Sequence, residues 1–188
     1  MTDNKHHYFF AIKLPNEVKT FLNRWVQMHN TQYPFKRWVH PEDYHITLAF
    51  LGFVEKNLLE KVQNQVGDML KHEDSFDLTL DEIGTFGSKK SPRIFWAGVK
   101  ESEELNLLQK KIFKICLESN LNLDKKPFNP HITLARKWES NQVFPSEKMP
   151  LLKNSEDGDF SFTVSEIALY ETHLNRTPKY KEYALYTF

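Results

Sequence analysis

The chain has 188 residues, a formal net charge of zero and a sequence pI of about 7.1. This balance gives no global attraction to nucleic acid or to anionic membranes, so any affinity for phosphate must be local. Hydrophobic residues make up 40% and aromatic residues 14%, enough for one packed domain over residues 1–188. The one cysteine, Cys116, excludes an intrachain disulfide, and residues 1–7 are polar, so we predict a cytoplasmic protein without a membrane span.

Apolar periodicity predicts strands and amphipathic helices along the chain. Strands are predicted over residues 8–14, 44–53, 76–80, 93–99, 131–134, 160–171 and 181–188. Helices are predicted over residues 18–28, 58–69 and 105–116. Loops are predicted around residues 33–34 and 41 and over residues 84–92, 120–130 and 139–159. Because strands outnumber helices, the predicted class is α+β, a bilobal fold in which two antiparallel β-sheets form a central cleft and the helices cover their outer faces.

A four-residue sequence, His-Ile-Thr-Leu, occurs twice, beginning at His45 and at His131. Alternate side chains of a strand share a face, so each copy places an imidazole beside a hydroxyl, the second members being Thr47 and Thr133. A predicted strand and helix precede each copy at nearly the same distance. The sequence therefore predicts an internal repeat with approximate two-fold symmetry, each lobe contributing one motif.

Two histidines and two hydroxyls that face one cleft suit acid–base chemistry on an oxyanion such as a phosphate. Because histidine titrates near neutral pH, one neutral imidazole can accept a proton while the other, protonated, donates one. Thr47 and Thr133 can donate hydrogen bonds to phosphate oxygens. The motifs are nearly symmetric, so residue chemistry alone leaves open which histidine is the acid. A catalytic zinc usually has three protein ligands, and neither motif contains Asp, Glu or Cys, so we expect no metal and no cofactor.

Five segments of the chain resemble the 2H phosphoesterases, a superfamily named for two His-x-Thr-x motifs. Within it, the chain is similar to the RNA 2′,3′-cyclic phosphodiesterases, historically called 2′-5′ RNA ligases. The segments begin at Phe9 (FFAIKLP), His45 (HITLAFLG), Pro92 (PRIFWAG), Pro130 (PHITLAR) and Leu169 (LYETHL). Together they extend over nearly the whole chain, and the two departures, Tyr44 and Thr172, fall outside the histidine motifs.

The resemblance implies metal-independent hydrolysis of RNA 2′,3′-cyclic phosphate ends to 2′-phosphomonoesters, with His45 as the proton donor and His131 as the proton acceptor. It also implies that Arg136 holds the phosphate, a role that the planar guanidinium suits. Strict alternation puts Arg136 on the face opposite His131, so this role requires a bulge or the end of the strand to turn it. The expected partners are RNA ends or small cyclic nucleotides, and the expected state is a monomer.

Three more residues are candidates for substrate binding. Phe9 and Phe10 flank the predicted cleft, where one of them could stack on a base. Arg93 lies close to Lys89 and Lys90 in a local basic cluster that could guide an RNA backbone.

Two other functions stay open at this point. A 2′-5′ RNA ligase or 2′-5′ phosphodiesterase would use the same two histidines, so the sequence barely separates it from a cyclic phosphodiesterase. The other alternative is a non-catalytic module that binds RNA or nucleotides. The two intact motifs argue against that module, because binding alone does not require two proton-transfer groups.

Overall fold

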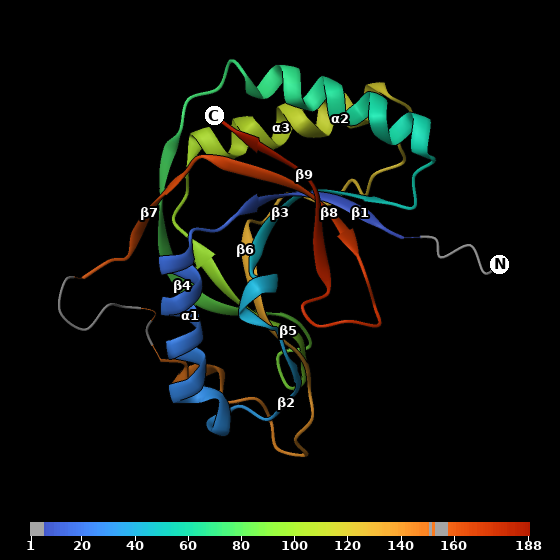
Figure 1. The fold of residues 1–188 in the computed structure, drawn as a ribbon. Helices are drawn as coiled ribbons and strands as arrows, with labels where there is room; N and C mark the ends of the chain where they lie inside the picture. The colour runs from blue at the N-terminus through green and yellow to red at the C-terminus, as the bar shows by residue number, and fades with distance from the viewer. Residues whose placement is uncertain (1–5, 151, 153–157) are drawn as a thin grey trace.

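The computed structural model describes residues 6–150, 152 and 158–188, and it has the predicted α+β class. Figure 1 shows the arrangement of the elements. The strands are β1 (Tyr8–Lys13), β2 (Phe35–Trp38), β3 (His45–Gly52), β4 (Phe76–Gly87), β5 (Pro92–Val99), β6 (His131–Trp138), β7 (Ser161–Val164), β8 (Glu166–Thr172) and β9 (Tyr180–Thr187). The helices are α1 (Asn16–His29), α2 (Lys56–Leu70) and α3 (Glu103–Glu118), with 3₁₀ turns at Asn30–Gln32, Pro41–Asp43 and Ser146–Lys148. None of the helices in the described residues is long and apolar enough to cross a membrane.

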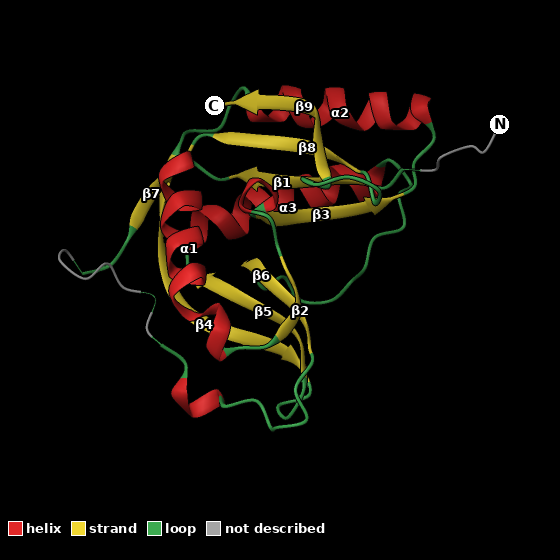
Figure 2. Ribbon diagram, turned by 60° about the horizontal axis from the view of Figure 1, so that its bottom comes forward, coloured by secondary structure: helices red, strands yellow, loops and turns green. Residues whose placement is uncertain are grey.

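All strand pairings are antiparallel, and they join the strands in one continuous order, β7-β4-β5-β6-β3-β1-β8-β9, with β2 paired to β6. The predicted separation into two sheets therefore differs from the observed hydrogen bonding. The junction is nevertheless narrow, because β3 and β6 share a single paired position, Ile46 with Ile132. Figure 2 shows β3, β1, β8 and β9 as one group of strands, and β2, β4, β5 and β6 as another.

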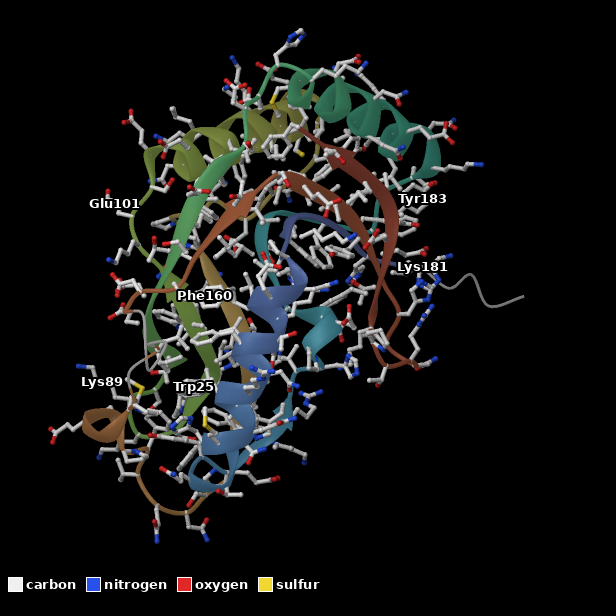
Figure 3. All side chains as sticks on the ribbon, turned by 60° about the vertical axis from the view of Figure 1, so that its left-hand side comes forward. Trp25, Lys89, Glu101, Phe160, Lys181 and Tyr183 are labelled. Carbon is white, nitrogen blue, oxygen red and sulfur yellow. The ribbon has the colours of Figure 1, made fainter. Side chains whose placement is uncertain are left out.

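Each group of strands packs against helices that bury its apolar face. Helices α2 and α3 cover the group that contains β3 and β9 (Figure 1). The N-terminus of α3 is capped by Ser102, whose hydroxyl accepts a hydrogen bond from the Leu105 amide at 3.1 Å. Helix α1 packs on the other group, with the ring of Trp25, labelled in Figure 3, 6.1 Å from that of Phe95 on β5. The face of each group of strands that these helices do not cover is available for a functional site.

Three elements differ from the sequence predictions. The strand predicted over residues 160–171 breaks at Ser165 into β7, which pairs with β4, and β8, which pairs with β1. Strand β4 continues through the predicted loop to Gly87. Strand β2 lies where the sequence predicts a loop, since only two of its four residues are apolar and its pairing to β6 is a tertiary contact. Residues 1–5, 151 and 153–157, at the polar N-terminus and in the loop predicted over 139–159, lie outside the described residues.

Candidate active site

The two His-Ile-Thr-Leu sequences begin two adjacent strands, β3 and β6, at the junction of the sheet. The paired residues Ile46 and Ile132 are fully buried. In each strand the histidine precedes this isoleucine and the threonine follows it, so strand alternation points both side chains to the face opposite the isoleucine. All four side chains on that face are half-buried. Diagonal positions of this kind lie about 7–8 Å apart in a regular antiparallel ladder, which one phosphate with its hydrogen bonds can bridge.

Each imidazole is held by a backbone carbonyl two residues before it. His45 Nδ1 donates to the Asp43 carbonyl at 2.7 Å, and His131 Nδ1 donates to the Asn129 carbonyl at 2.8 Å. A carbonyl can only accept, so both Nδ1 atoms carry the hydrogen and both Nε2 atoms are left for proton transfer in the neutral rings. His45 Nε2 lies 3.1 Å from Thr47 Oγ1. The arrangement can therefore move protons at two points of one face.

His45 lies in an aromatic enclosure. Its ring centroid is 4.9 Å from that of Phe9, 5.1 Å from that of Tyr180 and 5.9 Å from that of Tyr170. The pKa of His45 is lowered to about 4, mainly by burial, and the positive charges of a protonated His131 and of Arg136 act in the same direction. The hydrogen bond to Asp43 and the charge of its carboxylate act in the opposite direction but are outweighed. His45 is therefore neutral at pH 7 in the free protein.

His131 has a more open aromatic surrounding. The Phe86 ring meets it edge-on at 4.8 Å, and the Trp96 ring lies 6.3 Å away. Gly84 allows this arrangement, because a Cβ there would lie 2.2 Å from Trp96 Cζ2. Burial and the charge of Arg136 also lower the pKa of His131 from 6.5, although its hydrogen bond to Asn129 opposes them. A negatively charged ligand would raise the pKa of both histidines, because it stabilises their protonated forms.

Arg136 lies on the same sheet face as the histidines because β6 contains a bulge. Strand β5 pairs Trp96 with Thr133 but Phe95 with Ala135, so Leu134 is an extra residue. The extra residue reverses the alternation, and Arg136 is exposed on the face of Thr133. There its positive charge acts on both histidines and on the Tyr180 hydroxyl.

Strand β3 has a bulge at the equivalent place. Strand β1 pairs Phe10 with Ala49 but Ala11 with Thr47, so Leu48 is the extra residue. The residue three positions after the threonine, Phe50, consequently faces the site as Arg136 does. Its side chain is 53% exposed, so one bulge presents an aromatic ring and the other a cation.

Phe50 lines a cavity of about 520 Å³ that opens beside Thr47 and His131. The lining is mainly apolar. It also includes Phe86 and Phe128, with Gln109 and Asn129 among the polar members. A cavity of this size, walled by aromatic rings with a few polar groups, suits a planar heteroaromatic ligand such as a nucleobase.

Asp43 connects His45 to the segment that carries Tyr180, one of the rings that enclose it. Its side chain is buried, and its carboxylate accepts hydrogen bonds from the backbone amides of Lys179 at 2.9 Å and Tyr180 at 3.0 Å. The same residue thus holds the His45 ring through its carbonyl and the start of β9 through its side chain. Sequence reasoning missed Asp43, Tyr170 and Tyr180, because no local spacing relates the last two to the histidine motifs.

The structure contradicts the base-stacking role suggested for Phe10 and Phe9. Phe10 is fully buried in the main core, and only 3% of Phe9 is exposed, since its ring packs on His45. Neither ring offers a free surface to a base. Arg93 is also misplaced for substrate, because strand alternation puts it on the face opposite Trp96. Lys89, in the loop before Arg93, lies at the lower left of Figure 3.

The site defines a class of protein: a two-histidine phosphoesterase fold, with paired His-x-Thr motifs on one face. Comparison with family models gives the match expected for it, the 2′-5′ RNA ligase superfamily, over residues 14–176. The chain belongs to this superfamily.

Curated relatives agree with this assignment. The chain is 40% identical over 182 residues to a protein named RNA 2′,3′-cyclic phosphodiesterase from Geobacillus stearothermophilus, and it spans 57% of that relative's length. It is 31% identical to a protein of the same name from Bacillus subtilis, with 97% of this chain and 96% of the relative covered.

Solved structures share the fold. The crystal structure of Escherichia coli LigT complexed with 3′-AMP superposes with a TM-score of 0.81 at 26% identity, covering 97% of this chain and 98% of the other. The crystal structure of TT0787 of Thermus thermophilus gives a TM-score of 0.76 at 25% identity, covering 96% of this chain and 97% of the other. The likeness therefore extends through both groups of strands.

Proposed function

We propose that this chain hydrolyses the 2′,3′-cyclic phosphate at RNA ends to a 2′-phosphomonoester without a catalytic metal. The observation that carries the proposal is the convergence of His45, Thr47, His131 and Thr133 on one sheet face with Arg136 turned toward them. The names of the relatives from Geobacillus and Bacillus support the same activity. RNA ends or small cyclic nucleotides are the proposed partners, and a monomer is sufficient because one chain supplies the whole site.

The reaction needs one proton accepted and one proton donated. His131 Nε2 accepts a proton from water, whose oxygen forms a bond to phosphorus. The bond from phosphorus to the ribose O3′ breaks, and His45 Nε2 donates the proton that this oxygen needs. Thr47 and Thr133 donate hydrogen bonds to the non-bridging oxygens, and Arg136 balances their charge. The phosphate stays on O2′, and solvent returns both histidines to their starting states.

The burial of His45 has a consequence for this assignment. Its lowered pKa disfavours the protonated form in the free protein, whereas a proton donor must carry the proton. The negative charge of the bound cyclic phosphate raises that pKa again, so we infer that His45 becomes protonated with substrate in place. The enclosure by Phe9, Tyr170 and Tyr180 excludes water and strengthens this interaction, because a lower local dielectric strengthens charge–charge attraction.

We also infer that the two halves of the fold are related by an approximate two-fold axis between β3 and β6. Residues 46 and 132 are equivalent in the two motifs, and a two-fold axis pairs equivalent residues with each other, as Ile46 and Ile132 are paired. The extra residues Leu48 and Leu134 are equivalent in the same way. This relation supports a bilobal description in which each lobe supplies one histidine.

The cavity beside His131 is the proposed site of the nucleoside. A base between Phe50 and Phe86 would stack on aromatic rings that accept any base, and the polar edges of Gln109 and Asn129 could favour one over another. The phosphate would then lie toward Thr47 and His131, which line the same cavity.

A product assay on a defined oligonucleotide with a 2′,3′-cyclic phosphate end tests the proposed function. We expect a 2′-phosphomonoester, identified by phosphorus NMR, at a rate that a chelator does not change. Comparison with a 2′-5′-linked dinucleotide measures the competing activity. Faster turnover of that dinucleotide, or a 3′-phosphate product, would overturn the proposal.

A further inference from the structure

Three side chains with metal-binding atoms meet where the N-terminal segment joins β1. One ligand atom from each of His6, Glu171 and His173 lies within 4.8 Å of the other two, and all three residues are half-buried. His6 and His173 also line a cavity of about 280 Å³, which shares no lining residue with the cavity beside His131. The cluster is therefore a feature separate from the histidine motifs.

The strand pairing explains why these residues meet. Glu171 and His173 are two positions apart at the end of β8, so they share a face. Strand β1 pairs Tyr8 with Glu171, and the Thr172 amide donates to the His7 carbonyl at 2.9 Å, which continues the ladder beyond β1. This continuation places His6 beside the end of β8, and the centroid of its ring lies 4.4 Å from that of His173.

Hydrogen bonds hold all three side chains in place. His6 Nδ1 donates to the Thr172 carbonyl at 3.0 Å, so its Nε2 holds a free lone pair. Ring nitrogens that do not bind the metal are commonly fixed in this way by a carbonyl or carboxylate. The Tyr8 hydroxyl donates to Glu171 Oε1 at 3.1 Å, while Oε2 lies 2.9 Å from His173 Nε2. The tyrosine thus acts as an outer partner, while the second carboxylate oxygen faces His173 Nε2, where a bound ion would take the place of the hydrogen between the two atoms.

We propose that His6, Glu171 and His173 bind one divalent transition-metal ion of the zinc type, with water as a further ligand. Two imidazoles and a carboxylate are a common donor set for zinc. A His–Glu ion pair alone accounts for Glu171 and His173, but it does not explain a second imidazole packed against the first. The ion would join the N-terminal segment to the loop between β8 and β9, and it would take no part in the proposed reaction.

Zinc titration of the full chain, after dialysis against a chelator, tests this site. We expect one Zn²⁺ per chain by calorimetry and a visible absorption band of four-coordinate Co²⁺ in its place. His6→Ala, Glu171→Gln and His173→Ala should each weaken Zn²⁺ binding by more than about 10-fold, and Tyr8→Phe should weaken it by up to about 10-fold, as outer partners do. Zn²⁺ should raise the Tm of the wild type but not that of Glu171→Gln.

His7→Ala is the matched control, because His7 lines the same cavity but is not one of the three residues whose ligand atoms meet, and its ring packs edge-on against Phe50 at 5.7 Å. We expect this variant to keep wild-type affinity and the Co²⁺ band. An equal loss in His7→Ala and His6→Ala would mean that an unspecific histidine pair binds the ion, and the proposal would be wrong. Equal affinity of the wild type and Glu171→Gln would overturn it as well.

Discussion

The two histidine motifs share a scaffold but differ in their surroundings. In both, the histidine Nδ1 donates to a backbone carbonyl two residues earlier. In both, a bulge directly after the threonine turns the side chain three positions after that threonine toward the site. On the His45 side this position is Phe50, and on the His131 side it is Arg136. His45 is enclosed by three aromatic rings, whereas Phe86 and Trp96 leave His131 beside an open cavity.

This difference shows how a repeated unit can serve unequal steps of one reaction. Two identical histidine environments would give both imidazoles the same affinity for protons, but an acid and a base need different proton occupancy at the same pH. Burial, the position of one arginine and the shape of one aromatic enclosure supply the difference here. The strand geometry that holds the two imidazoles can remain common to both halves.

The largest effects should follow from removal of either imidazole. We expect His45→Ala and His131→Ala each to lower kcat on a ribose cyclic phosphate by about 10²-fold or more, with the double variant losing less than the product of the two. A phosphodiester with a p-nitrophenol leaving group, which needs no proton, should restore much of the rate of the variant that lacks the acid. Restoration in His131→Ala instead of His45→Ala would reverse our assignment.

Substitution of Arg136 and of Phe50, the residues that the two bulges turn toward the site, should separate the contribution of charge from that of base stacking. Arg136→Gln should lower kcat/KM by about 10–100-fold, the equivalent of a lost charged hydrogen bond of about 1.5–3 kcal/mol. Phe50→Ala should raise KM by about 10-fold with little change in kcat, because base stacking is lost. Phe53→Ala, an exposed phenylalanine outside the cavity lining, is the control. If Phe50→Ala behaves like that control, the base does not bind beside His131.

The pH profile should report the unequal burial of the histidines. The reaction needs one protonated and one neutral imidazole, and kcat/KM reports their protonation in the free enzyme. Since the pKa of His45 is about 4, kcat/KM should fall as the pH drops below about 4. Since the pKa of His131 is lowered from 6.5, kcat/KM should also fall on the alkaline side, from a pH below 6.5. The kcat profile should lie at higher pH, because bound phosphate raises both values. The apparent values belong to the pair. Coincident kcat and kcat/KM profiles would contradict this.

Gly84→Ala should disturb the His131 side alone. The new Cβ would overlap the Trp96 ring, and overpacking of this kind costs about 1–3 kcal/mol of stability. We expect a lower Tm and a lower kcat from the displaced Trp96 and Phe86. Gly52→Ala, at a positive φ of 67° on the His45 side, is a comparison that strains the backbone without a close contact to Trp96. Unchanged kcat in Gly84→Ala would show that Trp96 does not position His131.

The smallest effect is expected beside His45. The Tyr44 hydroxyl is buried and has no hydrogen-bond partner in the described residues. Tyr44→Phe removes a polar group that folding leaves unsatisfied, so the free energy of unfolding should stay constant or rise by about 1 kcal/mol, and kcat should not change. Urea unfolding measures the first and the cyclic phosphate assay the second. A marked loss of stability would mean that the hydroxyl is satisfied after all.

Local sequence patterns are sufficient for part of this site. Alternation predicts that His45 and Thr47 share a face, and helical spacing predicts all three helices, because both depend on nearest neighbours along the chain. The role of Arg136 is predicted only on condition of a bulge, which arises from the pairing of β6 with β5. Alignment of the two motifs matches Phe50 with Arg136, so the sequence is sufficient to predict that Phe50 faces the site.

The remaining residues depend on distant strands. Tyr170 and Tyr180 meet His45 only because β8 pairs with β1 and β9 pairs with β8. The break at Ser165 that separates β8 from β7 has no local signal in the sequence. The prediction for Phe10 is wrong because both sheet faces are buried near β1, so alternation could not tell the core from the site. The cytoplasmic location and the monomeric state stay predictions.

The carboxylate of Asp43 closes a loop of 136 residues to reach Lys179. Residues so far apart in the chain seldom meet in an unfolded chain, so this bond depends on the strand pairing that brings them together. On the ribosome, β9 also emerges after both histidine motifs. The enclosure of His45 is therefore completed only after β9 has been made, and a growing chain that holds both histidine motifs but not β9 still lacks the environment that separates their protonation states.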